Sequence, residues 1–461
     1  MNPLEISPEQ FRQLANRVTN LTTQYLESLP QRESFPSEAT GANTTAAFDS
    51  PLPQQGLGDH ALDALTDVLR LSRAPSPRFF GYVLGSGDPV GAVADLLASV
   101  LNQNVTAWRS GPAAVTIERT VVRWLAEAIG CGKFTGSLTG GGSSANLMGL
   151  MMARESRHAA NEEGARVGVV YASSEVHMSI AKAMSLLGLG HRNLRMIPVD
   201  ENFRMKVEEL ERAIEIDRTE AKSPIAVVAS AGTVNTGAID PLEKIAAIAR
   251  RHGLWMHVDG AYGALAAIAA PDKFHGLELA DSLSLDPHKW LYQPLDCGCL
   301  LFRDPTYAQR AFAHSGDYAK SLSSDPIEGF AFFEESMELS RRFRALKVWL
   351  SLRYHGLETF RQAIERDLGH AQALAQMVRD CRDLELLAPV ELSAVCFRHR
   401  GGDDAFNQRV LKCVVRRGKV YISNATVHGR FALRACFVNH RTTDADVRAV
   451  VEEVLAAARE V

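Results

Sequence analysis

One lysine lies where a lysine is not expected, at the end of a predicted buried strand. Lys289 stands in the run Asp286-Pro-His-Lys-Trp290, between the strand-like stretches 279–285 and 299–302. Burying an ammonium group is unfavourable, so lysines between core strands are uncommon. Such an amine is either a structural core residue or a group kept for chemistry, and Schiff-base formation is the reaction that an amine offers most readily.

A glycine-rich turn could bind an anion. The run Thr139-Gly-Gly-Gly-Ser-Ser-Ala-Asn146 leads into a predicted helix at 145–157. Glycines let a ligand approach the backbone, and a helix N-terminus offers free N–H groups and the positive end of the helix dipole. The spacing matches neither a Walker loop nor a Rossmann fingerprint. By itself the turn is as compatible with a structural bend as with phosphate binding.

Two further polar side chains follow predicted strands. Asp259 ends the strand 254–259, and a buried carboxylate needs a cationic partner. That partner is either an arginine or the protonated pyridine nitrogen of pyridoxal 5′-phosphate (PLP). His177 comes early in the predicted helix 175–187, where its imidazole either stacks on a cofactor ring or is a satisfied helix-terminal group. No His or Cys pair has the spacing of zinc ligands, so no metal site is predicted.

The elements that must position these residues alternate between strand and helix. Strands are predicted at 167–172, 194–199, 225–230, 254–259, 279–285 and 299–302, with helices at 145–157, 175–187, 205–217 and 241–252. Alternation with apolar strands is typical of an α/β domain with a buried, mostly parallel sheet. Ligands bind such sheets at the carboxyl ends of the strands, and Thr233, Asp259 and Lys289 all follow predicted strands.

The two ends of the chain differ from this central region. A capped amphipathic helix is predicted at 7–28, followed by a Pro-, Gly- and Ser-rich stretch, so its apolar face needs a second subunit or an intramolecular partner. Helices at 60–71, 90–101 and 114–129 lead into the alternating region. Beyond it, helices are predicted at 341–354, at 357–380 and from 444, and strands at 392–399, 419–423 and 431–438. We divide the chain into an N-terminal helical dimerisation segment (1–85), a large α/β domain (86–345) and a small α+β domain (346–461).

Composition is that of an ordinary globular enzyme. The 461 residues are 46% hydrophobic and 23% charged, with a net charge of −4, which gives no electrostatic case for nucleic acid. No stretch is apolar enough to span a bilayer and no signal-peptide pattern is present, so no membrane partner is expected. Seven cysteines without metal-like repeats are typical of reduced thiols, and we expect a cytoplasmic protein.

Together these motifs resemble those of the group II PLP-dependent decarboxylases, the family of aromatic-L-amino-acid decarboxylase and glutamate decarboxylase. The resemblance covers about residues 60–460 and is strongest at His257-Val-Asp-Gly-Ala-Tyr262, at 286–290 and at Asp296-Cys-Gly-Cys299. It implies the fold-type I architecture of PLP-dependent transferases and a homodimer with intertwined N-terminal segments. It also implies PLP as cofactor and an amino acid as substrate, which loses CO2 and leaves as the amine.

The resemblance implies a role for each matching residue. Lys289 would form the Schiff base with PLP, Asp259 would pair the pyridine nitrogen, and His177 would stack on the ring. The remaining cofactor contacts implied by the match are Gly142, Ser143, Thr233, Ala261, Asp286 and His288. Arg434 aligns with an arginine that some members use to bind a substrate carboxylate. Transamination or sulfur transfer on the same fold is disfavoured by the context of Lys289, and a DNA-binding regulator by the chain's length and charge.

Substrate identity is less readable from the residues. Phe80, Tyr82 and Trp108 indicate an aromatic or large apolar side chain, although the same residues are also ordinary core residues. The segment that carries a pocket tryptophan in the aromatic enzymes reads Arg73-Ala-Pro-Ser76 here, so acidic substrates stay possible.

One position departs from the family's pattern. In family members a loop before an Arg-Arg-Phe-Arg motif carries a tyrosine that protonates the carbanion left by CO2. Here the motif is 341–344, counting without gaps puts Phe332 at the tyrosine's position, and Tyr318 is the nearest tyrosine before it. A phenyl ring cannot donate a proton.

This departure leaves two products open. In plant relatives, phenylalanine at the matching position accompanies decarboxylation coupled to oxidative deamination, which gives an aldehyde, ammonia and peroxide. Alternatively another acid replaces the tyrosine, such as His177, Glu334, Glu335 or a group of the partner chain. The main prediction is therefore a carboxy-lyase that forms an amine, and the alternative is an aldehyde-forming enzyme.

Overall fold

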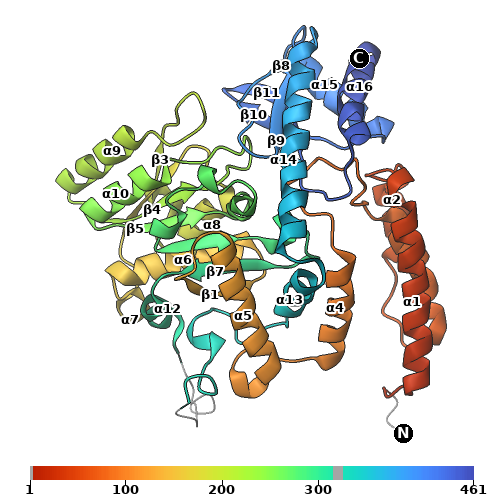
Figure 1. Cartoon of the computed structure of the whole chain (residues 1–461), viewed down its shortest axis with the longest axis horizontal. Coiled ribbons are helices and arrows are strands. Elements are labelled where there is room, and N and C mark those ends of the chain that lie inside the picture. Colours follow the sequence, from red (N-terminus) through yellow and green to blue (C-terminus); the bar gives the residue numbers. More distant parts are fainter. Residues whose placement is uncertain (1–3, 315–324) are drawn as a thin grey trace.

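The computed structural model describes residues 4–314 and 325–461, and its first helix begins where the capping pattern predicts. In α1 (Pro8–Ser28), Ser7 and Gln10 exchange side-chain and backbone hydrogen bonds, and Pro8 occupies the first turn. This confirms the helix predicted at 7–28. The helices α2 (Gly41–Phe48) and α3 (Leu65–Leu71) follow. α1 and α2 stand at one side of the molecule, at the right of Figure 1.

A sheet of seven strands forms the centre of the molecule. In chain order the strands are β1 (Thr135–Thr139), β2 (Val169–Ser173), β3 (Leu194–Ile197), β4 (Pro224–Ser230), β5 (Trp255–Asp259), β6 (Ser282–Leu285) and β7 (Gly298–Phe302). Their spatial order is β1-β7-β6-β5-β4-β2-β3, in which only the two pairings of β7 are antiparallel. The predicted fold class, an α/β fold with a mostly parallel sheet, is therefore confirmed. β1 was not predicted, because Thr135-Gly-Ser-Leu-Thr139 lacks an apolar run.

Helices cover both faces of this sheet (Figure 1). The helices of this part of the chain are α4 (Pro89–Leu101), α5 (Pro112–Ala128), α6 (Gly142–Arg157), α7 (Ala160–Glu163), α8 (Met178–Leu186), α9 (Val207–Thr219), α10 (Leu242–His252), α11 (Pro287–Trp290) and α12 (Pro305–Phe312). One apolar core lies between the sheet and α5 and α10, and a second lies between the sheet and α6, α8 and α12.

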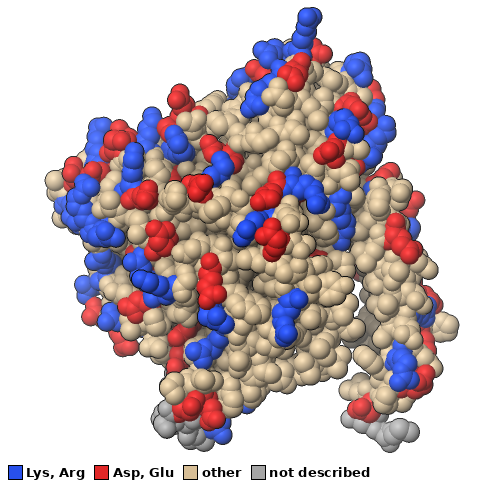
Figure 2. Space-filling view, in the orientation of Figure 1, with Lys and Arg blue, Asp and Glu red and all other residues tan. Residues whose placement is uncertain are grey.

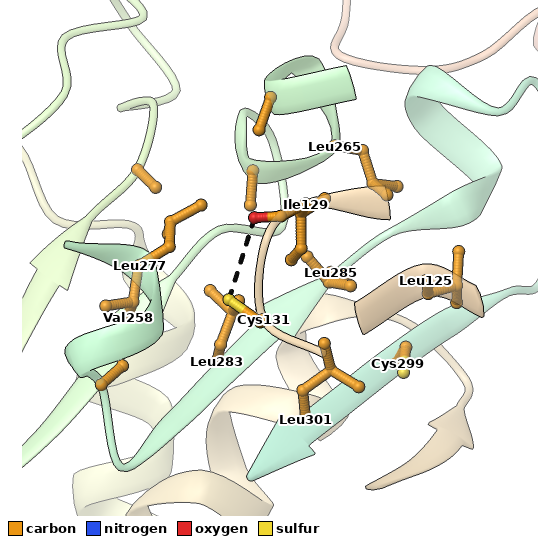
Figure 3. Close-up of a cluster of buried hydrophobic side chains, with 14 of the residues drawn as sticks. Leu125, Ile129, Cys131, Val258, Leu265, Leu277, Leu283, Leu285, Cys299 and Leu301 are labelled. Carbon is orange, nitrogen blue, oxygen red and sulfur yellow. Dashed lines mark hydrogen bonds between the residues drawn. The ribbon is translucent and has the colours of Figure 1, made fainter. Parts of the chain in front are cut away.

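Alternate residues of β5 and β6 face opposite sides of the sheet, and this places the polar ones. Leu283 and Leu285 pack with Leu125 of α5 in the first core (Figure 3). The opposite side of these two strands carries four polar residues that turn toward α6: Ser282 and Ser284 of β6, and His257 and Asp259 of β5. Side chains alternate across a strand, so one face of this strand pair is apolar and the other carries hydrogen-bonding groups.

A second layer is built from the C-terminal part of the chain. Its helices are α13 (Ala345–His355), α14 (Leu357–Asp380), α15 (Asp404–Arg417) and α16 (Asp444–Glu460). The strands β8 (Leu384–Leu386), β9 (Ala394–His399), β10 (Ser423–Val427) and β11 (Arg430–Cys436) form an antiparallel sheet of order β10-β11-β9-β8. The three-part domain division stated above stays a prediction.

One predicted strand of this layer was wrong. Residues 419–422 of the predicted strand 419–423 precede β10, and Tyr421 instead exchanges backbone hydrogen bonds with the segment 78–80. Val420 and Ile422 are buried on either side of it, which produced the alternating pattern of a strand. The early segment 78–80 is thereby fixed to the C-terminal layer.

Charge is mixed over the face drawn in Figure 2, where Lys and Arg side chains are interspersed with Asp and Glu. Within residues 4–314 and 325–461, no helix has both the length and the hydropathy that crossing a bilayer requires.

Candidate active site

Lys289 lies in the short helix α11, directly after β6 ends. Its Nζ is 2.8 Å from Asp286 Oδ2, and the two side chains are 17% and 3% exposed. The other carboxylate oxygen, Asp286 Oδ1, is buried and has no hydrogen-bond partner among the residues that the structure describes. A buried, unpartnered carboxylate oxygen beside an amine is a group held ready for a ligand rather than for the fold.

His288 stands beside this pair in a fixed orientation. Its Nδ1 is 2.7 Å from the carbonyl oxygen of Cys297, which can only accept, so Nδ1 donates. Burial lowers the pKa of His288, against the opposing effect of Asp286. The ring therefore presents Nε2 toward Asp286 Oδ2, at 3.7 Å.

The glycine turn lies against these residues. Gly141 has a φ of 132° and precedes Gly142, the first residue of α6. A Cβ atom added to Gly142 would lie 2.5 Å from the Cβ of Ala261 and 3.0 Å from Asp286 Oδ2. Glycine is thus required here by close packing. The first N–H groups of α6, including that of the exposed Ser143, lack intrahelical partners and are oriented so that they could bind an anion.

Asp259 ends β5 beside β6 and its carboxylate accepts hydrogen bonds on both oxygens. Oδ1 is 3.2 Å from Ser284 Oγ and 3.2 Å from the backbone nitrogen of Ala261. Oδ2 is 2.9 Å from Nδ2 of Asn146, which α6 supplies. Three donors around one carboxyl group suit an ionised carboxylate that can still accept from a protonated ring nitrogen.

His177 caps α8 and is connected to Asp259. Its Nδ1 is 2.8 Å from Ser179 Oγ and 3.2 Å from the backbone nitrogen of Ser179. Ser179 Oγ is in turn 3.0 Å from Asn146 Nδ2. Thr233 is buried in the loop after β4, where its hydroxyl is 3.0 Å from that of Thr236 and accepts from the backbone of Ala238 at 3.1 Å. That hydroxyl is used to shape the loop.

The predicted substrate-binding residues are not brought together in this way. Phe80 has no exposed surface and packs against Phe437 in the C-terminal core, so the expectation that it lines a substrate pocket is wrong. Tyr82 is 48% exposed, with its hydroxyl 3.3 Å from that of Tyr421. Trp108 is half-buried against the first core. Arg434 is buried and donates from Nε to the carbonyl oxygen of Asn235 at 3.1 Å.

Phe332 also needs a correction. It is fully buried in the first core, with the ring of Phe330 edge-on at 4.9 Å and the guanidinium of Arg341 4.3 Å from its centroid. A packed interior ring does not occupy the place of a proton donor facing a substrate. The place of Phe332 therefore contradicts its predicted catalytic role, and Tyr318, the other candidate, lies outside the described residues.

Sequence reasoning gave no individual role to four polar residues of the site: Asn146, Ser179, Ser282 and Ser284. In sequence they are ordinary helix and strand residues, because no motif marks a buried amide or hydroxyl. The one signal available was position, since Asn146 lies one turn after the glycine at the start of α6 and so shares its face.

The residues present fit PLP. A primary amine, an acceptor-only carboxylate and a glycine-lined helix N-terminus lie around Ala261 and Asp286, and within the described part of the chain Asp286 Oδ1 lacks a partner. Lys289, Asp259 and the α6 terminus could hold the aldehyde carbon, the ring nitrogen and the phosphate of this cofactor respectively.

Comparisons with known proteins also indicate a pyridoxal-dependent enzyme. A family model described as the pyridoxal-dependent decarboxylase conserved domain matches residues 46–400. The aromatic-L-amino-acid decarboxylase of Bacillus atrophaeus is 35% identical over 474 aligned residues, which cover 99% of this chain and 97% of that protein.

Two solved structures are similar over nearly their whole length. The crystal structure of Oryza sativa TDC with PLP and tryptamine has a TM-score of 0.92 at 27% identity, covering 100% of this chain and 99% of that one. Rhodiola rosea 4-hydroxyphenylacetaldehyde synthase has a TM-score of 0.90 at 27% identity, and both chains are covered to 100%.

Proposed function

Since the chain belongs to the pyridoxal-dependent decarboxylase family, we propose that it releases CO2 from an aromatic L-amino acid and forms the corresponding amine. The family establishes a PLP-dependent amino acid decarboxylase, whereas the substrate and the product are our proposal. The observation that carries it is the meeting of the Lys289–Asp286 pair, the Asp259 carboxylate and the glycine turn of α6 at one end of the strands.

Each residue has a separate task in this proposal. Bound PLP supplies an electron sink for the electron pair left when the bond to the carboxylate breaks. Asp259 would hold a proton on the ring nitrogen, and the first turn of α6 would bind the phosphate. Lys289 would hold the cofactor through its amine, and Asp286, 2.8 Å from that nitrogen, would accept a proton from the lysine or return it.

Positioning residues surround these groups. Ala261 is fixed by its backbone hydrogen bond to Asp259 and by contact with Gly142, so it offers a flat methyl surface for one face of the ring. His177, at the N-cap of α8, would pack against the other face. The remaining roles proposed from the family resemblance, those of Thr233 in the loop after β4 and of Arg434 beside it, would be indirect, because both side chains hold backbone groups of residues 235–238.

The aldehyde-forming reaction is the second candidate. Similarity to a 4-hydroxyphenylacetaldehyde synthase favours it, but Phe332, the residue that suggested it, is packed in the core. The route would consume O2 and water and release CO2, ammonia, hydrogen peroxide and an aldehyde. We favour the amine because the correction at Phe332 removes the residue-level reason for the alternative.

Product analysis decides between the two. PLP-loaded protein would be incubated in air with L-tryptophan, L-tyrosine, L-phenylalanine and L-dopa, with mass spectrometry for amines and aldehydes and a parallel peroxide assay. Amine without peroxide is expected, and the Lys289→Ala variant should give neither product. Aldehyde with equimolar peroxide would replace our proposal by the second candidate, and no turnover of any aromatic substrate would contradict the substrate class.

We also propose that the protein acts as a homodimer. No residue of α1 is buried in the single chain, and its apolar side chains Phe11, Val18 and Leu26 are 38–44% exposed. Five apolar residues of α4 are 46–66% exposed: Val93, Leu96, Leu97, Val100 and Leu101. A second copy would cover both faces, and light scattering should give a dimer that dissociates to monomer when residues 1–35 are removed.

All seven cysteines are free thiols, which supports the proposal of a cytoplasmic location.

A further inference from the structure

A continuous chain of buried hydrogen bonds runs beneath the candidate cofactor site. It begins at the indole Nε1 of Trp255, 2.9 Å from Ser282 Oγ, and passes to His257 Nδ1 at 2.8 Å. His257 Nε2 is 2.9 Å from Asn146 Oδ1. This series of hydrogen bonds branches at Asn146, because its Nδ2 lies 2.9 Å from Asp259 Oδ2 and 3.0 Å from Ser179 Oγ.

The ends of this chain fix the direction of its hydrogen bonds. An indole N–H can only donate, and an ionised carboxylate can only accept. Asn146 must therefore turn its amide nitrogen to Asp259 and its oxygen to His257, whose Nε2 then carries a proton. His257 Nδ1 accepts from Ser282, and Ser282 accepts from Trp255. Burial lowers the pKa of His257 to about 4, which agrees with a ring that carries one proton only.

The second branch fixes His177 by the same reasoning. Ser179 Oγ accepts from Asn146, so its own hydroxyl proton is free to go to His177 Nδ1, 2.8 Å away. The backbone N–H of Ser179 points at the same nitrogen from 3.2 Å. A nitrogen that accepts from two donors carries no proton, and the proton of the neutral ring is then on Nε2.

We propose that Asn146 is a positioning residue for two cofactor-facing side chains: it orients the Asp259 carboxylate and, through Ser179, holds His177 as the Nε2–H tautomer. The half-buried His177 ring can then offer an N–H on its open side. This inference rests on the proposed function only in naming those two side chains as cofactor-facing.

The packing of α6 supports this role over simple core filling. Asn146 is 1% exposed and each polar atom of its amide has a partner, two of them on the single nitrogen. Further along the helix, a Cβ atom at Gly149 would lie 2.5 Å from His257 Nδ1. A glycine in a helix interior is unfavourable by itself, so α6 gives up helix propensity where the His257 ring needs room.

The test is the tautomer of His177, read by NMR on full-length protein labelled with 15N-histidine, both free of PLP and loaded with it. The resonances of one ring among fourteen histidines are assigned by their loss in His177→Gln. Wild type should show an unprotonated Nδ1 and a protonated Nε2 in both states. Loss of one hydrogen bond should increase the share of the Nδ1–H tautomer about 2- to 10-fold in Asn146→Leu and in Ser179→Ala.

Ser284→Ala is the matched control, because it removes a donor to Asp259 and leaves the His177 branch intact. The Asp259 branch is read separately from PLP affinity, which should fall about 10-fold or more in Asn146→Leu and stay near wild type in Ser179→Ala. A protonated Nδ1 in wild type, or an unchanged His177 signal in folded Asn146→Leu, would overturn the proposal. If Asn146→Leu does not fold, the His177 tautomer in wild type and in Ser179→Ala still tests the proposal. The share of the Nδ1–H tautomer should be higher in Ser179→Ala than in wild type, and an equal share would overturn the proposal. The PLP-free spectra do not depend on turnover, so failure here and failure of the proposed function are distinguishable.

Discussion

Replacing Gly142 by alanine should weaken PLP binding while leaving the protein folded. The added Cβ would lie 2.5 Å from the Cβ of Ala261 and 3.0 Å from Asp286 Oδ2. Neither neighbour can move freely, because the Ala261 backbone donates to Asp259 and Asp286 is paired with Lys289. The strain therefore falls on the residues proposed to hold the ring and the lysine.

The size of the effect follows from the overlap. Overpacking one methyl group costs about 1–3 kcal/mol, against a gain in helix propensity of at most about 1 kcal/mol for replacing glycine. If the strain is expressed at the cofactor site, the dissociation constant of PLP should rise about 5- to 150-fold. Titration of PLP-free protein followed by the absorbance of bound cofactor measures it, and thermal unfolding without PLP reports the fold.

Gly369→Ala is the matched control for this prediction. Gly369 lies inside α14 with nothing within 4 Å of an added Cβ, so alanine should leave PLP affinity unchanged and stabilise the helix by about 0.5–1 kcal/mol. A Gly142→Ala protein that binds PLP within about 2-fold of wild type would refute the reasoning, because the α6 turn would then not be the tight cradle described.

Three further predictions concern buried groups. Burial raises the pKa of Asp367 to about 7, so its stabilising contribution is present below about pH 4 and is lost as the pH rises to 7. The free energy of unfolding should fall by about 1–4 kcal/mol over that range, and urea titrations of Asp367→Asn should lack this slope. Glu118→Gln should lower the stability by about 3–5 kcal/mol in the same assay, because it leaves the fully buried Arg341 without its carboxylate partner. Phe332→Tyr should destabilise by about 1–3 kcal/mol through an unpaired buried hydroxyl, with the same ratio of amine to aldehyde as wild type.

Much of the fold could be predicted because local signals and burial agree. The capping pattern at Ser7 and Pro8 specifies the start of a helix. The alternation of apolar strands with amphipathic helices specifies a buried sheet covered by helices. The failures share a cause. β1 carries few apolar residues, and 419–422 alternates like a strand while its backbone pairs with 78–80, so long-range pairing decided both.

Candidate site residues could be singled out where the chemistry requires a recognisable motif. They could not be singled out where only packing distinguishes a site residue from a core residue. Lys289, Asp259 and Gly142 could be singled out because amines, buried carboxylates and glycine turns are uncommon at strand ends. Phe80 and Phe332 could not be told from pocket residues, because an aromatic side chain satisfies a core and a ligand equally well in sequence. Only the contacts with Phe437 and Arg341 separate the two cases.

One face of α6 carries both kinds of residue, those marked by a sequence motif and those recognised only from packing. Gly142, Asn146 and Gly149 lie at i, i+4 and i+7, so they share the face that meets β5 and β6. Along this face the first admits Ala261 and Asp286, the second bonds Asp259 and His257, and the third makes room for the His257 ring. An apolar stripe would have attached the helix equally well. The three small or polar residues instead bring its backbone close to the sheet, and a single helix thereby places its N-terminus and an amide donor in fixed relation to β6, after which Lys289 lies.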